Sequence, residues 1–253
     1  SLKERTGSYL TTAELLFHLN LIDSTGNAKF SFRDNNKKLL TMELAAITDE
    51  QWEGSDVSNI NLTVPEIKET TIDNPNLWYT SILGTKAIYI NFAGYPSFEE
   101  MQVFGAQLVS DIQEKQIKQV IIDMRENGGG DLYVGIVLAY ALNLADCIDW
   151  KNGVFVLTSN KTFSAATSNA ALFKQLLNAK IVGQPTGSNP NGYQDMDSFT
   201  LPNSKLVITY SKRLFRLSPQ ENTALQPDII INQQQHDFFM GIDTVLKELI
   251  RTL

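Results

Sequence analysis

The first feature able to carry chemistry is a run of three glycines, Gly128, Gly129 and Gly130, shortly after an apolar stretch at residues 119–124. Glycines let the backbone come close to another group and point its N–H groups at it. Such a loop can bind an anion or form an oxyanion hole, and it can equally be a tight turn between a strand and a helix. No Gly-Lys-Ser/Thr follows and the spacing is not G-x-G-x-x-G, so the common nucleotide-binding loops are excluded.

Ser164 is the second candidate, because it stands where an apolar stretch at 154–158 gives way to a helix-forming stretch at about 165–178. A serine at a helix N-terminus can act as a nucleophile, since that end of a helix stabilises developing negative charge. Serine is also a preferred N-cap residue, and the pattern alone leaves both interpretations open.

A third loop, at residues 183–193, contains Gly187 and Asn189 among many turn-forming residues and could line a cleft. Further along, Glu221 lies in the stretch Ser-Pro-Gln-Glu-Asn. It could orient a catalytic base, and it could equally be a solvated loop residue.

Few other side chains offer a catalytic base or a metal ligand. His18 lies among apolar residues, which favours a packed histidine, and His236 follows three glutamines, which favours a solvated one. Cys147 lies close to two aspartates, which disfavour its thiolate. As the one cysteine, it excludes an internal disulfide and a multi-cysteine metal site. We therefore expect no metal and no cofactor.

The composition limits the possible partners. The chain has 253 residues, 43% of them hydrophobic and 19% charged, which excludes global disorder. Asp and Glu number 28 against 21 Lys and Arg, so the net charge is −7. Nucleic-acid binding needs a basic face, and we expect no nucleic-acid partner. No apolar stretch reaches the roughly 18 residues of a membrane-spanning helix, and the N-terminus shows no signal-peptide pattern.

From about residue 77 strands alternate with helices, which predicts an α/β domain with a largely parallel sheet. A capping box, Ser97 with Glu100, marks one helix start. In such folds functional residues collect at the C-terminal ends of the strands, where all three candidate loops fall. The expected strands are 87–92, 119–124, 154–158, 180–182, 198–201, 206–210 and 227–231, and the expected later helices are 131–144, 165–178 and 238–249.

The residues before 77 are organised differently. A helix that opens at Thr11 or Thr12, followed by strands at 28–33 and 39–45, is too small to bury a core of its own. Residues 49–76 are polar and contain glycine and prolines, which predicts a linker on the surface. The expected organisation is therefore a segment at 1–48, a linker at 49–76 and the main domain at 77–253.

The three loops, in this order and followed by a Pro-Asp-Ile stretch, resemble the S41 family of serine peptidases, which includes C-terminal-processing and tricorn-type proteases. The resemblance implies a ClpP/crotonase-like layout of repeated ββα units, and it makes the opening helix and hairpin part of a PDZ-like region. It also implies a serine endopeptidase acting on peptides or proteins outside the cytoplasm, and it leaves a homo-oligomer open. The matching stretches are 120–130, 154–158 with 162–166, 181–187 and 225–229.

The resemblance also implies roles for single residues. Ser164 matches the nucleophile that forms an acyl-enzyme. The amides of Ala165 and of one glycine in the run, Gly129 above the others, match the oxyanion hole. The substrate cleft would be lined by Gly128, Gly130, Gly187 and Asn189.

The general base of the family has no match. In the Ser/Lys branch a lysine comes from the loop after Gly-x-Pro-Thr, where this sequence has Asn189, which cannot take a proton. The tricorn-like branch uses a glutamate, which Glu221 matches, and a histidine from before the PDZ-like region. His18 comes too late in the chain to be that histidine, so we expect the base to lie outside this sequence.

Two other functions remain open. A non-catalytic relative could bind peptides in the same cleft. An acyl-CoA enzyme of the crotonase type would share the layout and the glycine-built oxyanion hole, although no basic cluster for the CoA phosphates is evident. Reaction with a serine-directed probe separates the peptidase from both.

Overall fold

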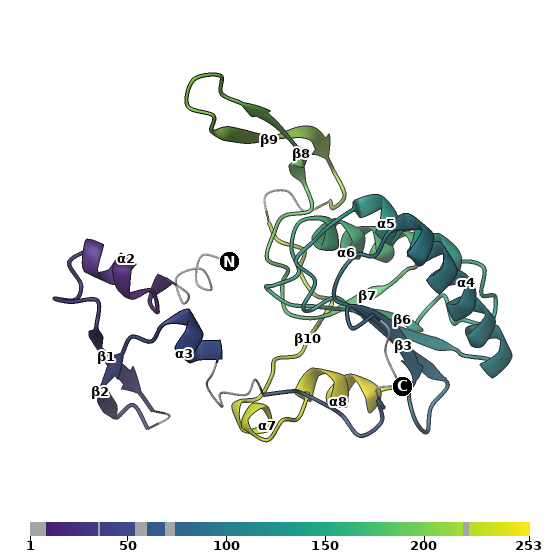
Figure 1. Cartoon of the computed structure of the whole chain (residues 1–253). Helices are drawn as coiled ribbons and strands as arrows, with labels where there is room; N and C mark the ends of the chain where they lie inside the picture. Colours follow the sequence, from purple (N-terminus) through teal and green to yellow (C-terminus); the bar gives the residue numbers. More distant parts are fainter. Residues whose placement is uncertain (1–8, 35, 54–59, 69–73, 220–222) are drawn as a thin grey trace. The chain divides into compact units, whose positions relative to one another are not determined.

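The computed structural model describes residues 9–34, 36–53, 60–68, 74–219 and 223–253. They fall into two compact units, residues 1–59 and 60–253 (Figure 1). The boundary lies inside the segment expected to be a linker. In the second unit, Val64 from that segment is buried and packs against apolar residues of the sheet and the last helix.

The first unit contains the expected helix and hairpin. Helix α2 (Ala13–His18) is shorter than its apolar pattern suggests, and α3 (Asp49–Glu53) was not anticipated. Strands β1 (Asn27–Arg33) and β2 (Leu39–Ala45) pair antiparallel along their whole length. Every described residue of β2 is exposed, in keeping with a segment too small to enclose a core.

The second unit is built on a six-stranded sheet with the order β10-β7-β6-β5-β4-β3. The α/β prediction is confirmed: β4, β5, β6, β7 and β10 run parallel, and β3 is an antiparallel edge strand that the sequence analysis missed. The strands are β3 (Leu77–Ser81), β4 (Ala87–Phe92), β5 (Gln119–Asp123), β6 (Val154–Thr158), β7 (Lys180–Gly183) and β10 (Ile229–Ile230).

Helices cover both faces of this sheet (Figure 1). Alternate residues of β5 explain its continuous apolar sequence: Val120 and Ile122 pack with the layer of α4, α5 and α6, and Ile121 packs on the α8 side. Ser97 and Glu100 form the predicted capping box at the start of α4. The helices are α4 (Phe98–Lys115), α5 (Leu132–Leu142), α6 (Ala165–Leu176), α7 (Gln235–Phe239) and α8 (Thr244–Ile250).

Two sequence predictions for the second half of the chain are wrong: one concerns its last helix, and the other a pair of strands. The single helix expected at 238–249 is divided into α7 and α8, with Gly241 at a φ of 70° between them. Asp243 then caps α8 by accepting a hydrogen bond from the Leu246 amide.

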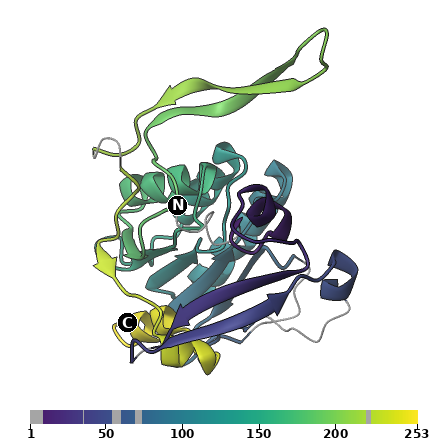
Figure 2. The same ribbon diagram turned by 90° about the vertical axis from the view of Figure 1, so that its left-hand side faces the viewer.

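The strands expected at 198–201 and 206–210 are longer and do not join the main sheet. They are β8 (Gly192–Thr200) and β9 (Val207–Phe215), which form a separate two-stranded hairpin that extends away from the layered core (Figures 1 and 2). The side chain of Asn191 closes its base, accepting from the Leu217 and Ser218 amides and donating to the Ser218 carbonyl. The hairpin is therefore held by its own pairing and by its root.

None of the helices in the described part of the chain combines the length and hydropathy needed to span a membrane.

Candidate active site

The three candidate loops meet at one edge of the sheet. They follow β5, β6 and β7, which are neighbouring parallel strands, so their carboxyl ends lie side by side. The loops are residues 124–131, 159–164 and 184–191.

A fully buried asparagine, Asn127, ties the glycine loop to the serine loop. Its Nδ2 donates to the Phe92 carbonyl at 2.8 Å, and its Oδ1 accepts from the Gly129 amide at 3.0 Å. Its own carbonyl accepts from the Phe163 amide at 3.1 Å. The sequence analysis missed Asn127, although a polar residue that stands directly before a glycine run and a few positions after a buried strand is the signal that could have found it.

Thr162 makes the second set of links. Its Oγ1 donates to the Met124 carbonyl at 2.8 Å and accepts from the Ser159 amide at 3.0 Å. The Thr162 carbonyl accepts from the Gly187 amide at 2.8 Å, which attaches the third loop. The chemistry-bearing residues thus stand on a cross-linked framework rather than on independent loops.

Ser164 is exposed and has an unusual backbone, with φ 52° and ψ −125°. A positive φ is strained for any residue with a Cβ, and such strain gathers at functional sites. Ser164 occupies the N-cap position of α6, but its side chain makes no capping hydrogen bond. The capping interpretation therefore loses its main support, and the hydroxyl is left available for chemistry.

Gly129 packs directly against this serine. A Cβ at Gly129 would lie 2.8 Å from the Ser164 Cβ and 2.9 Å from the Phe163 carbonyl oxygen, and its own φ is 110°. Only glycine fits there. Its amide, the expected oxyanion donor, is directed to Asn127. By contrast, no described residue accepts a hydrogen bond from the amides of Gly128, Gly130 or Ala165.

The strain at Ser164 predicts an uncommon result: Ser164→Gly should raise the free energy of unfolding by about 1 kcal/mol. Relief of about 1–3 kcal/mol of strain outweighs the extra backbone entropy of glycine in the unfolded chain, about 0.5–1 kcal/mol. Urea unfolding measures the difference. Ser168→Gly, inside the same helix, is the control and should lose about 2 kcal/mol, about half from the poor helix propensity of glycine and about half from the lost hydrogen bond to Gln194. Equal losses in both variants would show that Ser164 is not strained.

The other candidates lie as follows. Asn189 is half-buried, and its Oδ1 accepts from the Asn191 amide at 2.9 Å. Lys161, close to Ser164 in sequence, pairs with Glu126 at 2.8 Å, and both side chains are exposed. Glu221 lies outside the described residues.

The two histidines belong to elements other than the three loops. His18 belongs to the first unit, and His236 is an exposed residue of α7, beside the helix that covers the opposite face of the sheet. In the described ranges, no side chain hydrogen-bonds to the Ser164 hydroxyl, and no group of His, Cys, Asp and Glu is placed to hold a metal. Among the described residues of the three loops, the Ser164 hydroxyl thus has no hydrogen-bonded proton acceptor.

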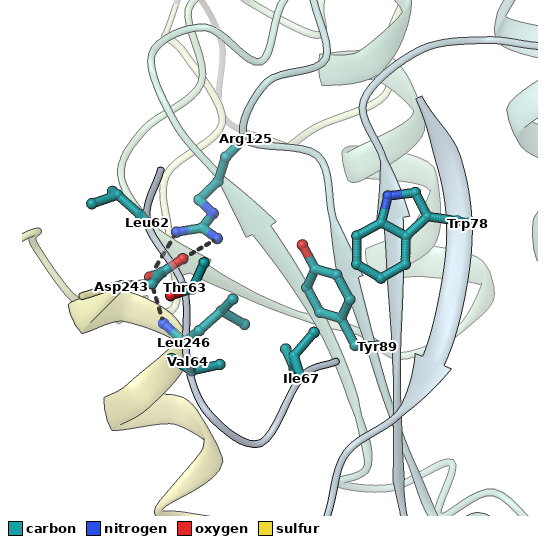
Figure 3. Close-up of a pocket in the computed structure, with 9 residues that line it drawn as sticks. All are labelled: Leu62, Thr63, Val64, Ile67, Trp78, Tyr89, Arg125, Asp243 and Leu246. Carbon is teal, nitrogen blue, oxygen red and sulfur yellow. Dashed lines mark hydrogen bonds and ion pairs between the residues drawn. The ribbon is translucent and has the colours of Figure 1, made fainter. Parts of the chain in front are cut away.

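Behind the glycine loop, Arg125 lies between the carboxylates of Asp123 and Asp243. Figure 3 shows its pairing with Asp243. Its Nη2 is 2.6 Å from Asp123 Oδ2 and 2.6 Å from Asp243 Oδ2, and Tyr89 donates to Asp123 at 2.8 Å. Arg125, Asp243 and Tyr89 border a small cavity of about 90 Å³ that Trp78 also lines. The cluster joins the end of β5 to the start of α8.

The ionisation of the cluster follows from its contacts. Burial favours the neutral form of Asp123, but the charge of Arg125 and hydrogen bonds from Arg125 and Tyr89 hold its pKa below the ordinary value. Burial and the neighbouring Asp123 raise the pKa of Tyr89 well above its ordinary value. At neutral pH Tyr89 is therefore neutral, and Asp123 is ionised beside the Arg125 cation.

Neither a protein-family model nor a curated protein sequence matches this chain. Solved structures do. A candidate S41 protease from Bacteroides fragilis matches with a TM-score of 0.53 and 12% identity over 88% of this chain and 64% of that one. A candidate peptidase from Parabacteroides merdae matches with a TM-score of 0.52 and 17% identity, over 80% of this chain and 68% of that one. Mature CPAF matches with a TM-score of 0.54 and 13% identity, over 90% of this chain and 66% of that one. This chain thus spans slightly less than two thirds of the first structure's length, and at these identities the likeness concerns the fold.

Proposed function

Starting from the S41-protease fold of this chain, we propose that it belongs to the S41 peptidases and is a serine endopeptidase that cleaves peptide bonds through an acyl-enzyme on Ser164. One observation carries the proposal: an exposed, strained and uncapped serine stands where three cross-linked loops meet. The family resemblance adds a location outside the cytoplasm.

The proposed reaction uses Ser164 and nearby amides. Ser164 Oγ attacks the scissile carbonyl carbon while its proton passes to a base, the amine leaves with a proton, and water hydrolyses the ester. The oxyanion would be held by the Ala165 amide and by the amide of Gly128 or Gly130, because the Gly129 amide expected for this role donates to Asn127. Each such donor is worth about 3–4 kcal/mol in the transition state. Gly187 and Asn189 would border the substrate.

The base is a separate part of the proposal. Asn189 stands where the Ser/Lys branch has its lysine, and an amide cannot accept the proton of Ser164. We therefore propose a tricorn-like arrangement, in which a histidine from outside the three loops takes the proton and Glu221 orients it.

The test is labelling by a fluorophosphonate probe, followed by intact-mass measurement and peptide mapping. We expect one adduct, on Ser164, and unchanged labelling in Ser198→Ala, which removes an exposed hydroxyl in the hairpin. If the chain binds unstructured peptides but neither it nor a form extended at the N-terminus gives an adduct at any pH from 5 to 9, the proposal is wrong and the peptide-binding alternative holds.

A further inference from the structure

We propose that Ser188 is a positioning residue that holds the backbone of Ser164 in its strained conformation, an inference that rests on the function proposed above. Ser188 comes from the loop after β7, and its hydroxyl accepts a hydrogen bond from the Ser164 amide at 2.9 Å. No motif in the sequence points to it.

The Ser188 hydroxyl is one member of a directed relay. It donates to Thr167 Oγ1 at 2.9 Å, and Thr167 donates to the Thr162 carbonyl at 2.9 Å. Both threonines are fully buried, whereas Ser188 is half-buried. Because each hydroxyl in the relay has one donor and one acceptor partner, the Ser188 lone pairs are directed at the Ser164 amide.

The relay secures one particular peptide bond, the one that joins Phe163 to Ser164. Its N–H is held by Ser188, and its carbonyl accepts from the Ala166 amide at 3.0 Å. Rotation of this peptide group would relieve the positive φ of Ser164, and it would break both bonds. Gly129, packed against the Ser164 Cβ, restricts the same rotation from the other side.

Two consequences follow. The Ser164 amide is occupied and cannot serve as an oxyanion donor, and the Gly129 amide is likewise occupied by Asn127, which leaves that role to the amides of Ala165, Gly128 and Gly130. The Oγ direction of Ser164 depends on the Ser188 hydroxyl, because a relaxed backbone turns the Cα–Cβ bond. Removing that hydroxyl should therefore slow attack by Ser164 more than it weakens ligand binding.

The experiment compares wild type, Ser188→Ala and Ser188→Thr by the kinetics of fluorophosphonate labelling. We expect Ser188→Ala to lower the maximal labelling rate at least tenfold with the half-saturating probe concentration within twofold of wild type. Ser188→Thr, which keeps the hydroxyl, should stay within threefold of wild type in both quantities. Equal maximal rates in wild type and Ser188→Ala would overturn the inference and leave the proposed function standing.

A second measurement needs no activity. Amide hydrogen exchange by NMR should show the Ser164 amide protected in wild type and at least tenfold less protected in Ser188→Ala, with the interior amides of α6 unchanged. If wild type is not labelled but this difference appears, the proposed function fails and the positioning by Ser188 holds. An unprotected Ser164 amide in wild type would overturn the positioning itself.

Discussion

Ser164→Ala is expected to abolish fluorophosphonate labelling and to lower peptide hydrolysis at least about a thousand-fold. Its free energy of unfolding should stay within about 0.5 kcal/mol of wild type, the range of changes that remove no stabilising contact. Alanine keeps the Cβ, so the backbone strain and the contact with Gly129 remain, and no cap is lost because the Ser164 hydroxyl makes none. Labelling kinetics and urea unfolding on the same preparations check both parts.

Ser168→Ala, the control, should lose stability and keep the labelling of Ser164. Ser168 lies one turn further along α6, is fully buried, and its Oγ hydrogen-bonds to Gln194 Oε1 at 2.8 Å. Its loss should cost about 1 kcal/mol of stability and leave Ser164 labelling intact. If Ser164→Ala were instead the variant that loses about 1 kcal/mol, Ser164 would be a helix cap and the proposed chemistry would lose its basis.

Arg125→Met is expected to cost the second unit about 3–5 kcal/mol at pH 7, the usual cost of removing one partner of a buried ion pair. Asp123 and Asp243 are 8% and 3% exposed, and without the guanidinium two carboxylates remain in the interior with no cation. Urea unfolding at pH 7 measures the loss. The matched control is Arg251→Met, which breaks an exposed pair with Glu248 and should cost at most about 1 kcal/mol.

The free energy of unfolding should depend on pH in opposite directions in wild type and in Arg125→Met. In wild type the pKa of Asp123 is depressed, so its contribution is present above the unfolded-state value of about 3.9 and is lost as pH falls through the folded-state value. In Arg125→Met the guanidinium is gone, and burial, which raises the pKa of Asp123, is opposed by the hydrogen bonds from Tyr89 and from the amide of residue 125. The variant should then lose stability as pH rises from 5 to 7. A loss of equal size at both pH values would contradict this account.

The sequence predicted those parts of the molecule that depend on local pattern. The apolar run of β5 indicated burial on both faces, the spacing of Ser97 and Glu100 indicated a helix start, and parallel strands implied that the three loops share an edge. The rest depends on contacts between distant residues. Arg125 and Asp243 are 118 positions apart, and neither carries a local signal of pairing.

In the candidate site too, the sequence predicted the features that depend on local pattern and not those that depend on distant contacts. The types of Gly129 and Ser164 and their neighbourhood could be inferred from the glycine run and the strand-to-helix transition. The strain at Ser164 could not, because a positive φ at a non-glycine residue is imposed by the surrounding contacts of Asn127 and Ser188. The β8–β9 strands were predicted too short and in the wrong sheet, since alternating side chains do not specify which partner a strand takes.

The way the hairpin is anchored has a topological consequence. The chain leaves the layered core at Gly192 and returns at Phe215, and these two residues face each other in the first pair of the ladder. The third pair, Gln194 with Arg213, still contacts Ser168 and Tyr133 of the core. Beyond it the ladder can grow or shrink by matched residues without moving the two ends apart. The length of the hairpin can therefore differ between homologues, and its tip can accept an inserted sequence. The loop that carries Ser188 and Asn189 keeps its position in either case.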